Sequence, residues 1–585
     1  MKNFIQKPFQ ALNRHLGLWK EAVHQASLIE MARQRVFSAG IVMAVAYIVI
    51  AGRLIDVMAL QSSKKIDLSA IPAEVNPFPR GDIFDRNGNI LATHLVTASL
   101  YTNAKVVLNA KDAAKKLATL FPEVGYDTFF NRLTSGKGFN WLVRHIPPRM
   151  QQAVNELGIP GVYLQTDYKR VYPYAELTSH IVGYCGIDNS GLAGIEQFYD
   201  EKLTKSTENI QLSIDIRLQH IVHDVLINAI EEFNAEGANA MVMDIKTGEM
   251  LAMVSLPDFD PNRLNSVKAE STFNRNTLGV YEPGSTFKIL NTAIALESGS
   301  ATVNSIFDAS APVRIGRFKI TDFKGKNRPM TLTEGLVYSS NIVSIKVAQR
   351  FGIHLQKEYF KRFGIMQATL LEIPEIGKPL IPTVWKEPTL MTASYGYGIA
   401  VTPLQIMSAI GTVINEGVQV KPTLMYQSDE ARKELFIKQK ETAPIISART
   451  SEAIREMLRM IVRNAQVRVI DVSGYEVFGK TGTALQNKGH GYSGKTRNTF
   501  FVGGFPMNNP QVMVVVMLDD AKASAKTHNY ATAGWNAAPT AGKIIERIAP
   551  VLGLQPTDEE TQIKHIRIDE PPSQGFIRTS LKNQN

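Results

Sequence analysis

Cysteine is nearly absent from this chain, which has one, Cys185, among 585 residues. An intrachain disulfide and a metal site built from several cysteines are therefore excluded. A lone cysteine is most often a buried small residue, and we interpret Cys185 in that way. Charge of one sign is not concentrated either. Lys and Arg exceed Asp and Glu by 64 to 54, but they are scattered and form no stripe typical of nucleic-acid binding.

Long apolar runs are equally scarce, because only one stretch could cross a bilayer. Residues 36–52 carry no charge, and Leu54 and Ile55 extend the stretch past Arg53. About 20 helical residues span a membrane, and Arg53 could reach the interface. The basic residues 1–35 before it predict a cytoplasmic N-terminus. A cleaved signal peptide fits less well, since the charged leader is long; a buried core helix is the other alternative.

The most informative stretch surrounds Ser285. Pro283 and Gly284 interrupt the preceding structure, and apolar residues then recur at helical spacing as far as Gly299. Ser285 is thus predicted at a helix N-terminus, which favours negative charge. Lys288 follows by one turn, so its amine can reach the Ser285 hydroxyl. A lysine of lowered pKa can activate a serine. The alternative is a helix-capping serine beside a solvated lysine.

A second serine lies between two predicted helices. Residues 331–334 form a capping box that opens a short helix, and a second helix is predicted at 342–350, ending at Gly352. Ser339 and Asn341 fall at the junction, where alternate side chains can face one cleft. On its own, this pattern is equally explained by a capping junction.

A third cluster lies on a predicted strand at 475–484. Alternation places Lys480 and Gly482 on one face and Thr481 and Thr483 on the other. Gly482 would leave room for a ligand backbone alongside the strand. Two further strands of an antiparallel meander and a closing helix are predicted at 497–505, 511–518 and 538–552.

Two other matches are interpreted without chemistry. Lys246-Thr247-Gly248 lies between two apolar runs and is predicted to be a hairpin turn. Residues 489–496 fit the phosphate-loop formula, but a strand-like segment with glycines follows where such a loop requires a helix. We therefore predict a glycine-rich loop between two strands.

Ser-x-x-Lys, Ser-x-Asn and Lys-Thr-Gly in this order form a set typical of penicillin-binding proteins and serine β-lactamases. The chain resembles a class B penicillin-binding protein, a monofunctional peptidoglycan DD-transpeptidase. Segments similar to that family's pedestal (dimerisation) module and transpeptidase domain are Arg80–Gly88, Gly194–Gln197, Glu282–Lys288, Tyr395–Gln405 and Lys480–Thr483.

The resemblance implies a multidomain α/β fold. It comprises one N-terminal transmembrane helix, a mixed α+β pedestal, and a transpeptidase domain with an antiparallel sheet flanked by helices. The expected location is the inner membrane, with a single pass, a cytoplasmic N-terminus and a periplasmic catalytic domain. The segments expected are a basic cytoplasmic one at 1–35, the anchor at 36–57, the pedestal at 58–225, the transpeptidase domain at 226–553 and a disordered tail at 554–585.

The resemblance also implies roles for the site residues. Ser285 would attack the carbonyl between the terminal D-alanines of a stem peptide. Lys288, kept neutral by burial and by Lys480, would be the general base. Ser339 would pass a proton to the leaving D-alanine, and Asn341 would hold Lys288 and the substrate amide.

Substrate binding is assigned to the Lys480 strand. Lys480, Thr481 and Thr483 would bind the terminal carboxylate, while the strand, with Gly482, pairs with the extended peptide. The N–H groups of Ser285 and Thr483 would form the oxyanion hole. β-Lactams would acylate the same serine, and neither metal nor organic cofactor is called for.

The sequence Ser339-Ser340-Asn341 is similar to the septum-building branch, since the elongation branch usually carries aspartate in the third place. Expected partners are a multi-pass lipid-linked glycan polymerase and other division proteins; nucleic acid is not expected. An elongation-type transpeptidase, a β-lactamase, and a membrane-anchored β-lactam sensor or scaffold without turnover are the alternatives.

Overall fold

The computed structural model describes residues 33, 37–51, 79–323, 325–463, 470–487 and 492–556, without the side chains of 486, 487 and 492–495. Residues 37–51 form one exposed helix. Within the described ranges, no helix is both long and apolar enough to cross a membrane. The predicted anchor at 36–57 extends past this helix on both sides, beyond the described residues. Most of the predicted segments 1–35 and 554–585 also lies outside them.

The described chain divides into two compact units. The first unit includes the described residues before residue 74 together with Leu100–Val143 and Gln152–Leu164. Its later part contains helices α2 (Ala110–Leu120) and α3 (Tyr126–Leu133). The Asn109 side chain caps α2 by accepting from Asp112 N. Ala113, Leu117 and Phe129 are buried, so the inner faces of the helices form a small core.

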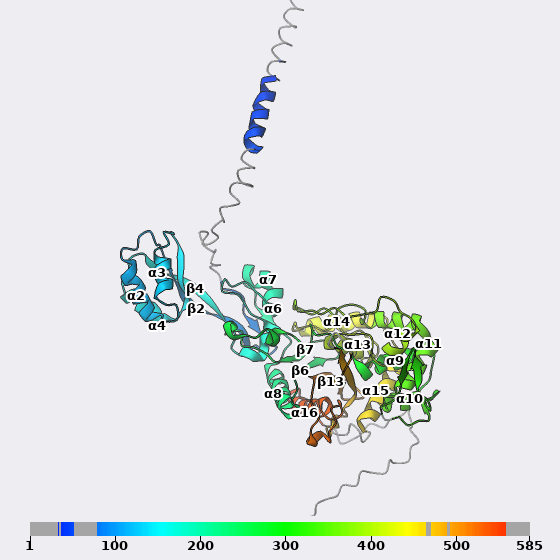
Figure 1. Ribbon diagram of the computed structural model, residues 1–585. Helices are drawn as coiled ribbons and strands as arrows, with labels where there is room; N and C mark the ends of the chain where they lie inside the picture. Colours follow the sequence, from blue (N-terminus) through cyan, green and yellow to red (C-terminus); the bar gives the residue numbers. More distant parts are fainter. Residues whose placement is uncertain are drawn as a thin grey trace, which may run out of the picture. The chain divides into compact units, whose positions relative to one another are not determined.

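The predicted module of strands and short helices is confirmed (Figure 1). Its sheet has the order β3–β2–β1–β5, with β4 also paired to β2. Strands β1 and β2 pair as a hairpin whose turn contains Asn87 and Gly88, and Gly88 has φ +84°. The strands are β1 (Ile83–Phe84), β2 (Ile90–Thr102), β3 (Asn140–Ile146), β4 (Val162–Val171) and β5 (Ile210–Gln211). The helices are α4 (Pro148–Glu156), α5 (Ser179–Val182), α6 (Gly194–Phe198) and α7 (Asp200–Lys205).

In the second unit, buried ion pairs connect Arg80–Gly88 with Gly194–Gln197, the two segments that resemble the pedestal module. Arg80 Nε and Arg170 Nε donate to the two carboxylate oxygens of Glu196, at 2.7 Å and 2.6 Å. Removing one partner of such a group would leave an uncompensated buried charge.

Cys185 is half-buried, which corrects the prediction of a buried residue. Its backbone N–H donates a hydrogen bond to the Tyr172 hydroxyl.

The central sheet of the second unit is antiparallel, with the order β12–β13–β14–β6–β7. The predicted meander is confirmed, and so is the turn at Lys246-Thr247-Gly248, where Gly248 has φ +78°. The sequence did not show that this hairpin joins the meander through β14 and β6, with Val512 opposite Asp244. The strands are β6 (Gly237–Asp244), β7 (Met250–Leu256), β12 (Phe478–Asn487), β13 (Tyr492–Phe505) and β14 (Val512–Asp519).

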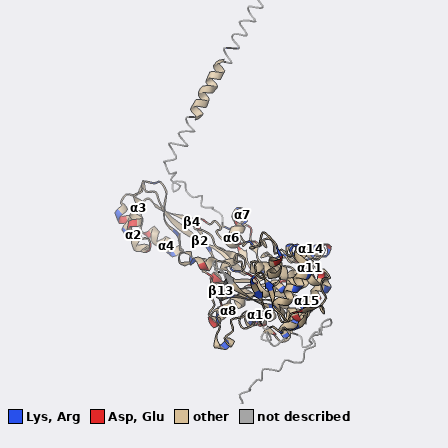
Figure 2. Cartoon of the chain, turned by 45° about the vertical axis from the view of Figure 1, so that its right-hand side comes forward, with Lys and Arg blue, Asp and Glu red and all other residues tan. Residues whose placement is uncertain are grey.

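Helices cover both faces of this sheet (Figure 1). One layer consists of α8 (Ile216–Phe233) and α16 (Ala537–Val551), which contact each other and strands β6, β7 and β14. The other contains α9 (Phe287–Glu297), α13 (Pro403–Ile414) and α15 (Ala448–Arg463). The predicted antiparallel sheet flanked by helices is thereby confirmed. Basic and acidic residues share the same elements in Figure 2, in keeping with the scattered charge of the sequence.

The remaining elements surround the helical layer. The capping box at Thr331 and Glu334 is confirmed, and the predicted break at Gly352 is present at φ +80°, although helix resumes beyond it. The elements are β8 (Ile306–Asp308), β9 (Val313–Ile315), β10 (Phe318–Ile320), β11 (Pro329–Thr331), α10 (Leu332–Val337), α11 (Asn341–Arg362), α12 (Glu387–Ala393) and α14 (Asp429–Glu441).

Candidate active site

Ser285 lies in a 3₁₀ turn, Gly284–Thr286, that runs directly into α9. The predicted position at the start of a helix is therefore confirmed. Gly284 has φ +54°, and a Cβ there would lie 3.1 Å from the Thr483 carbonyl oxygen of β12. The turn thus needs glycine, both for its backbone conformation and for its approach to the strand.

Lys288 is the centre of the site, with 2% of its surface exposed. Its Nζ lies 3.1 Å from Ser285 Oγ and 3.2 Å from Ser339 Oγ. It also lies 2.6 Å from the Ser339 carbonyl oxygen and 2.7 Å from Asn341 Oδ1. The structure therefore brings the Ser-x-x-Lys and Ser-x-Asn patterns together on one amine.

The kinds of partner define what this amine can do. The Ser339 carbonyl oxygen and Asn341 Oδ1 can only accept hydrogen bonds, and they are the two closest atoms. A neutral amine that donates its two N–H groups to them keeps its lone pair for a hydroxyl. Ser285 and Ser339 are the hydroxyls within reach, so Lys288 can take a proton from either.

Charge and burial favour the neutral form of Lys288. Burial lowers the pKa of Lys288 well below its usual value, the positive charge of Lys480 lowers it further, and Asp322 opposes both. Burial alone lowers the pKa of Lys480 to about 7. Two cationic groups in one dry site do not remain charged together, and Lys288 carries the additional penalty.

Lys480 points from β12 into the same interior and is 2% exposed. Its Nζ donates to the Thr481 carbonyl oxygen at 3.3 Å, the one hydrogen bond it has within the described residues. It is thus a buried cation with few partners, unlike Lys288.

Gly482 lies against the turn that carries Ser285. A Cβ at this position would lie 2.9 Å from the Pro283 carbonyl oxygen and 2.9 Å from Thr286 Cγ2. The missing side chain therefore makes room for the turn that carries Ser285. The prediction that Gly482 leaves room for a ligand backbone stays a prediction.

The two threonines complete the strand. Thr481 is half-buried, and Thr483 Oγ1 accepts from Ala533 N at 3.1 Å. Because its oxygen accepts that bond, the Thr483 hydroxyl proton remains available for an anion. Among the described strands, β12 pairs only with β13 and is an edge of the sheet. Such an edge can accept an extended peptide.

The junction between α10 and α11 is strained where it meets Lys288. Ser339 has φ +58°, a left-handed conformation that costs about 1–3 kcal/mol for a residue other than glycine. Ser340 caps α11 by accepting from Val343 N at 3.0 Å. The junction that the sequence predicted is therefore present, and its strained residue is the one whose carbonyl faces the amine.

Sequence reasoning assigned no site role to Glu282, to Gly396 or to Asp322. Glu282 Oε1 accepts a hydrogen bond from Gly398 N at 2.7 Å, and Gly284 N donates to the Gly396 carbonyl oxygen. The loop that contains Gly396 and Gly398 therefore holds the turn that carries Ser285. Asp322 accepts from Ser340 and Asn341. The Tyr395–Gln405 resemblance pointed to the loop, but no local signal identified Asp322.

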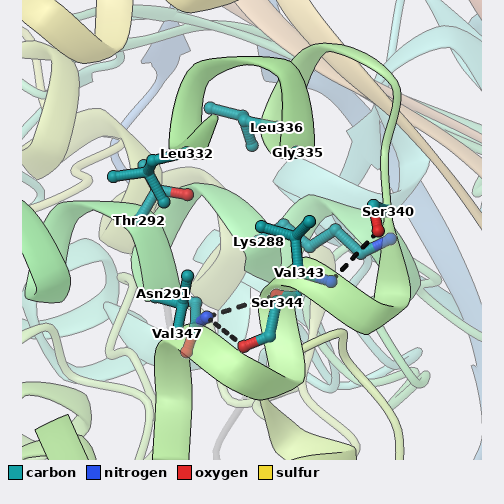
Figure 3. A pocket seen from close by; sticks show the side chains of 10 residues that line it. All are labelled: Lys288, Asn291, Thr292, Leu332, Gly335, Leu336, Ser340, Val343, Ser344 and Val347. Carbon is teal, nitrogen blue, oxygen red and sulfur yellow. Dashed lines mark hydrogen bonds between the residues drawn. The ribbon is translucent and has the colours of Figure 1, made fainter. Parts of the chain in front are cut away.

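A pocket borders Lys288 between α9, α10 and α11 (Figure 3). Across it, Asn291 Nδ2 donates to the Ser344 carbonyl oxygen at 3.0 Å and to Ser344 Oγ at 3.2 Å. These bonds connect the helix of Lys288 to the helix that begins at Asn341. Within the described ranges, no group of three or more His, Cys, Asp or Glu residues could hold a metal ion.

Comparisons with known proteins agree with this geometry. Residues 238–546 match the model of the penicillin binding protein transpeptidase domain, and residues 75–217 match the penicillin-binding protein dimerisation domain. The chain is 32% identical to a probable peptidoglycan D,D-transpeptidase FtsI of Caulobacter vibrioides, covering 85% of each chain. It is 30% identical to stage V sporulation protein D of Bacillus subtilis, over 83% of this chain and 80% of that one.

A solved structure shares the fold. The peptidoglycan synthetase of Bifidobacterium adolescentis superimposes with a TM-score of 0.64 at 20% identity, over 83% of this chain and 97% of that one. At this identity the likeness concerns the fold alone.

A serine and a buried lysine beside the edge of an antiparallel sheet, within a matched transpeptidase domain, define a serine-type D-Ala-D-Ala transpeptidase, an acyltransferase. The match covers more than half of the chain, and a dimerisation domain precedes it. The chain therefore belongs to the penicillin-binding protein transpeptidase family, as a class B penicillin-binding protein.

Proposed function

We propose that this chain cross-links peptidoglycan stem peptides at the division septum through an acyl-enzyme on Ser285, and that β-lactams acylate the same serine. The observation that carries the proposal is the position of Lys288 Nζ, within 3.2 Å of both serine hydroxyls and of Asn341 Oδ1. A buried, neutral amine in that position can act as base and then as acid.

In the first step, Ser285 Oγ attacks the carbonyl carbon between the two terminal D-alanines, and its proton moves to Lys288. The N–H groups of Ser285 and Thr483 stabilise the oxyanion. Collapse breaks the C–N bond, and Ser339 gives its proton to the leaving amine and takes one from Lys288 in return, so that D-alanine departs and Lys288 is neutral again. The amine of a neighbouring stem peptide then attacks the ester and loses a proton to Lys288. The C–O bond to Ser285 breaks, Lys288 returns the proton to Ser285 Oγ, and the cross-link is formed.

Substrate binding is assigned to β12. The charge of Lys480 and the hydroxyls of Thr481 and Thr483 bind the terminal carboxylate. The free edge of β12 pairs with the peptide backbone. The pairing occurs near Gly482, the residue that lies against the turn carrying Ser285.

The septal role rests on Asn341 as the third residue of Ser339-Ser340-Asn341. We further propose a cytoplasmic segment 1–35, a single-pass inner-membrane anchor at 36–57, a periplasmic pedestal at 58–225, a transpeptidase domain at 226–553 and a polar tail at 554–585. Proposed partners are a multi-pass lipid-linked glycan polymerase and other division proteins.

A fluorescent penicillin tests the acyl-enzyme. The full-length protein is expected to acquire a label that lasts many minutes, and Ser285→Ala to acquire none. Ser298→Ala, a serine beyond the last turn of α9, is the matched control and is expected to label normally. A label on Ser285→Ala would contradict the nucleophile, and rapid release from the unaltered protein would indicate a β-lactamase instead.

Depletion in cells tests the septal role. Loss of a septal enzyme is expected to give filaments, because growth continues while division stops. Round cells would indicate the elongation branch. Normal division and cross-linking with Ser285→Ala as the only copy would indicate a sensor or scaffold without turnover.

A further inference from the structure

Asp322 lies two residues beyond β10 and outside every motif recognised in the sequence. Its carboxylate accepts three hydrogen bonds from the segment that carries Ser339 and Asn341. Ser340 Oγ donates to Oδ2 at 2.6 Å, and the backbone N–H groups of Asn341 and Ile342 donate to Oδ1 at 2.6 Å and 3.1 Å. A carboxylate from a distant segment thus binds the junction directly.

These bonds supply what α11 lacks at its start. The first N–H groups of a helix have no partner within it. Ser340 Oγ accepts from the third residue, Val343, while Asp322 accepts from the first two. Its negative charge also lies at the positive end of the helix dipole. Asp322 therefore completes the cap and fixes where α11 begins.

The neighbouring residue orients the Asn341 amide. Asn341 Nδ2 donates to the Thr321 carbonyl oxygen at 3.0 Å, so Oδ1 faces Lys288 Nζ. Thr321 and Asp322 together hold both the backbone and the side chain of Asn341. They also brace the turn at Ser339, whose left-handed backbone needs external support.

The segment is itself firmly placed. The hairpin of β9 and β10 turns one apolar face inward, where Ile315 packs with Ile345 of α11, Met391 of α12 and Tyr395. Asp322 therefore extends from a hairpin packed on α11 itself.

Its charge acts on the same amine. The charged groups that influence Lys288 are Lys480 from β12 and Asp322 from the segment after β10. Burial and Lys480 lower the pKa of Lys288, whereas Asp322 raises it, because a nearby negative charge favours the ammonium form.

We propose that Asp322 is a positioning residue for acyl transfer: it caps α11 and so holds the Ser339–Asn341 turn against Lys288. The proposal rests on the functions proposed above for Ser285 and Lys288. It assigns a task to a residue that does not touch the substrate.

The test measures the second-order rate of acylation by a fluorescent penicillin as a function of pH, with the full-length protein. The variants are Asp322→Asn, which keeps the shape and removes the charge, and Asp322→Ala, which removes both. Asp308→Asn is the matched control, because Asp308 is an exposed residue on β8 whose carboxylate accepts from Ser310 N and forms an ion pair with Lys346. Rates are normalised to titrated active sites, and Tm is recorded for each variant.

For Asp322→Asn we expect the acid limb of the profile to move to lower pH, since Lys288 loses its proton more readily without the carboxylate. For Asp322→Ala we expect the plateau rate to fall as well, on the order of a hundredfold, because a displacement near 1 Å can cost that much. Asp308→Asn is expected to keep both the limb and the plateau.

Unchanged profiles for both Asp322 variants would overturn the proposal. A lower rate with an unmoved acid limb in Asp322→Asn would also overturn it, since a purely structural residue would behave in that way. Ser285→Ala separates the two proposals. If that variant is still labelled, the proposed function fails. If it is silent while Asp322→Asn matches the unaltered protein at every pH, only the positioning role fails.

Discussion

The two buried lysines of the site are equally hidden from solvent but differ in their surroundings. Lys288 has four oxygen atoms within 3.2 Å, whereas Lys480 has one hydrogen bond, at 3.3 Å, within the described residues. The first amine is fully positioned before any substrate arrives. The second has a single partner, which suits the carboxylate binding proposed for it. The four oxygen atoms around Lys288 suit the proton transfer proposed for that residue.

Replacing Lys288 should have the largest effect. Lys288→Met removes the proton acceptor and keeps the volume, so we expect the acylation rate to fall by about 10²- to 10⁴-fold, as for other general bases. Stopped-flow labelling with a fluorescent penicillin measures it. The control is Lys346→Met, which should retain the rate. Lys346 is a lysine of α11 that pairs with Asp308 of β8. A loss below tenfold would contradict the assignment of Lys288 as base.

Gly482→Ala tests whether β12, which carries Lys480, and the turn before Lys288 must keep a fixed separation. The added Cβ would lie 2.9 Å from the Pro283 carbonyl oxygen, so the serine turn must move away from β12. We expect a loss on the order of a hundredfold in acylation, since small displacements are costly. Gly138→Ala, whose Cβ meets nothing within 4 Å, should be silent. An unchanged rate for Gly482→Ala would show that turn and strand adjust independently.

Lys480→Gln should separate recognition from proton transfer. Loss of a charged hydrogen bond to the carboxylate should raise KM about 10- to 100-fold. Removing the positive charge also raises the pKa of Lys288, so the acid limb should move to higher pH, opposite to Asp322→Asn. In the unaltered protein, the pKa of Lys480 is about 7, so its charge is lost as pH rises through that value. The alkaline limb of kcat/KM should therefore lie near neutrality; a flat profile there would contradict the role of Lys480.

The local parts of this molecule could be predicted from sequence, because the signals are short. The apolar period after Gly284 located α9, the box at Thr331 and Glu334 located α10, and the alternation around Lys480 located β12. Each depends on neighbours within about one or two turns, where spacing determines which face a side chain occupies.

The remaining features depend on contacts between distant segments. The pairing of β6 with β14, the approach of Gly482 to Pro283 and the bonds from Asp322 to the Ser340 junction join residues far apart in the chain. No periodicity carries that information. For this reason the sequence did not show the contact of Gly482 with the serine turn, and Asp322 could not be found without the fold.

The pairing of β14 with β6 also sets an order of events during synthesis. Ser285 and Lys288 are made before β12, which carries Lys480, and before β14, whose pairing with β6 ends at Asp519. Until both strands are made, the serine turn has neither Lys480 nor the edge of β12 beside it, and such long-range strand pairing is slow to form. The site is therefore completed only after β14 has been made.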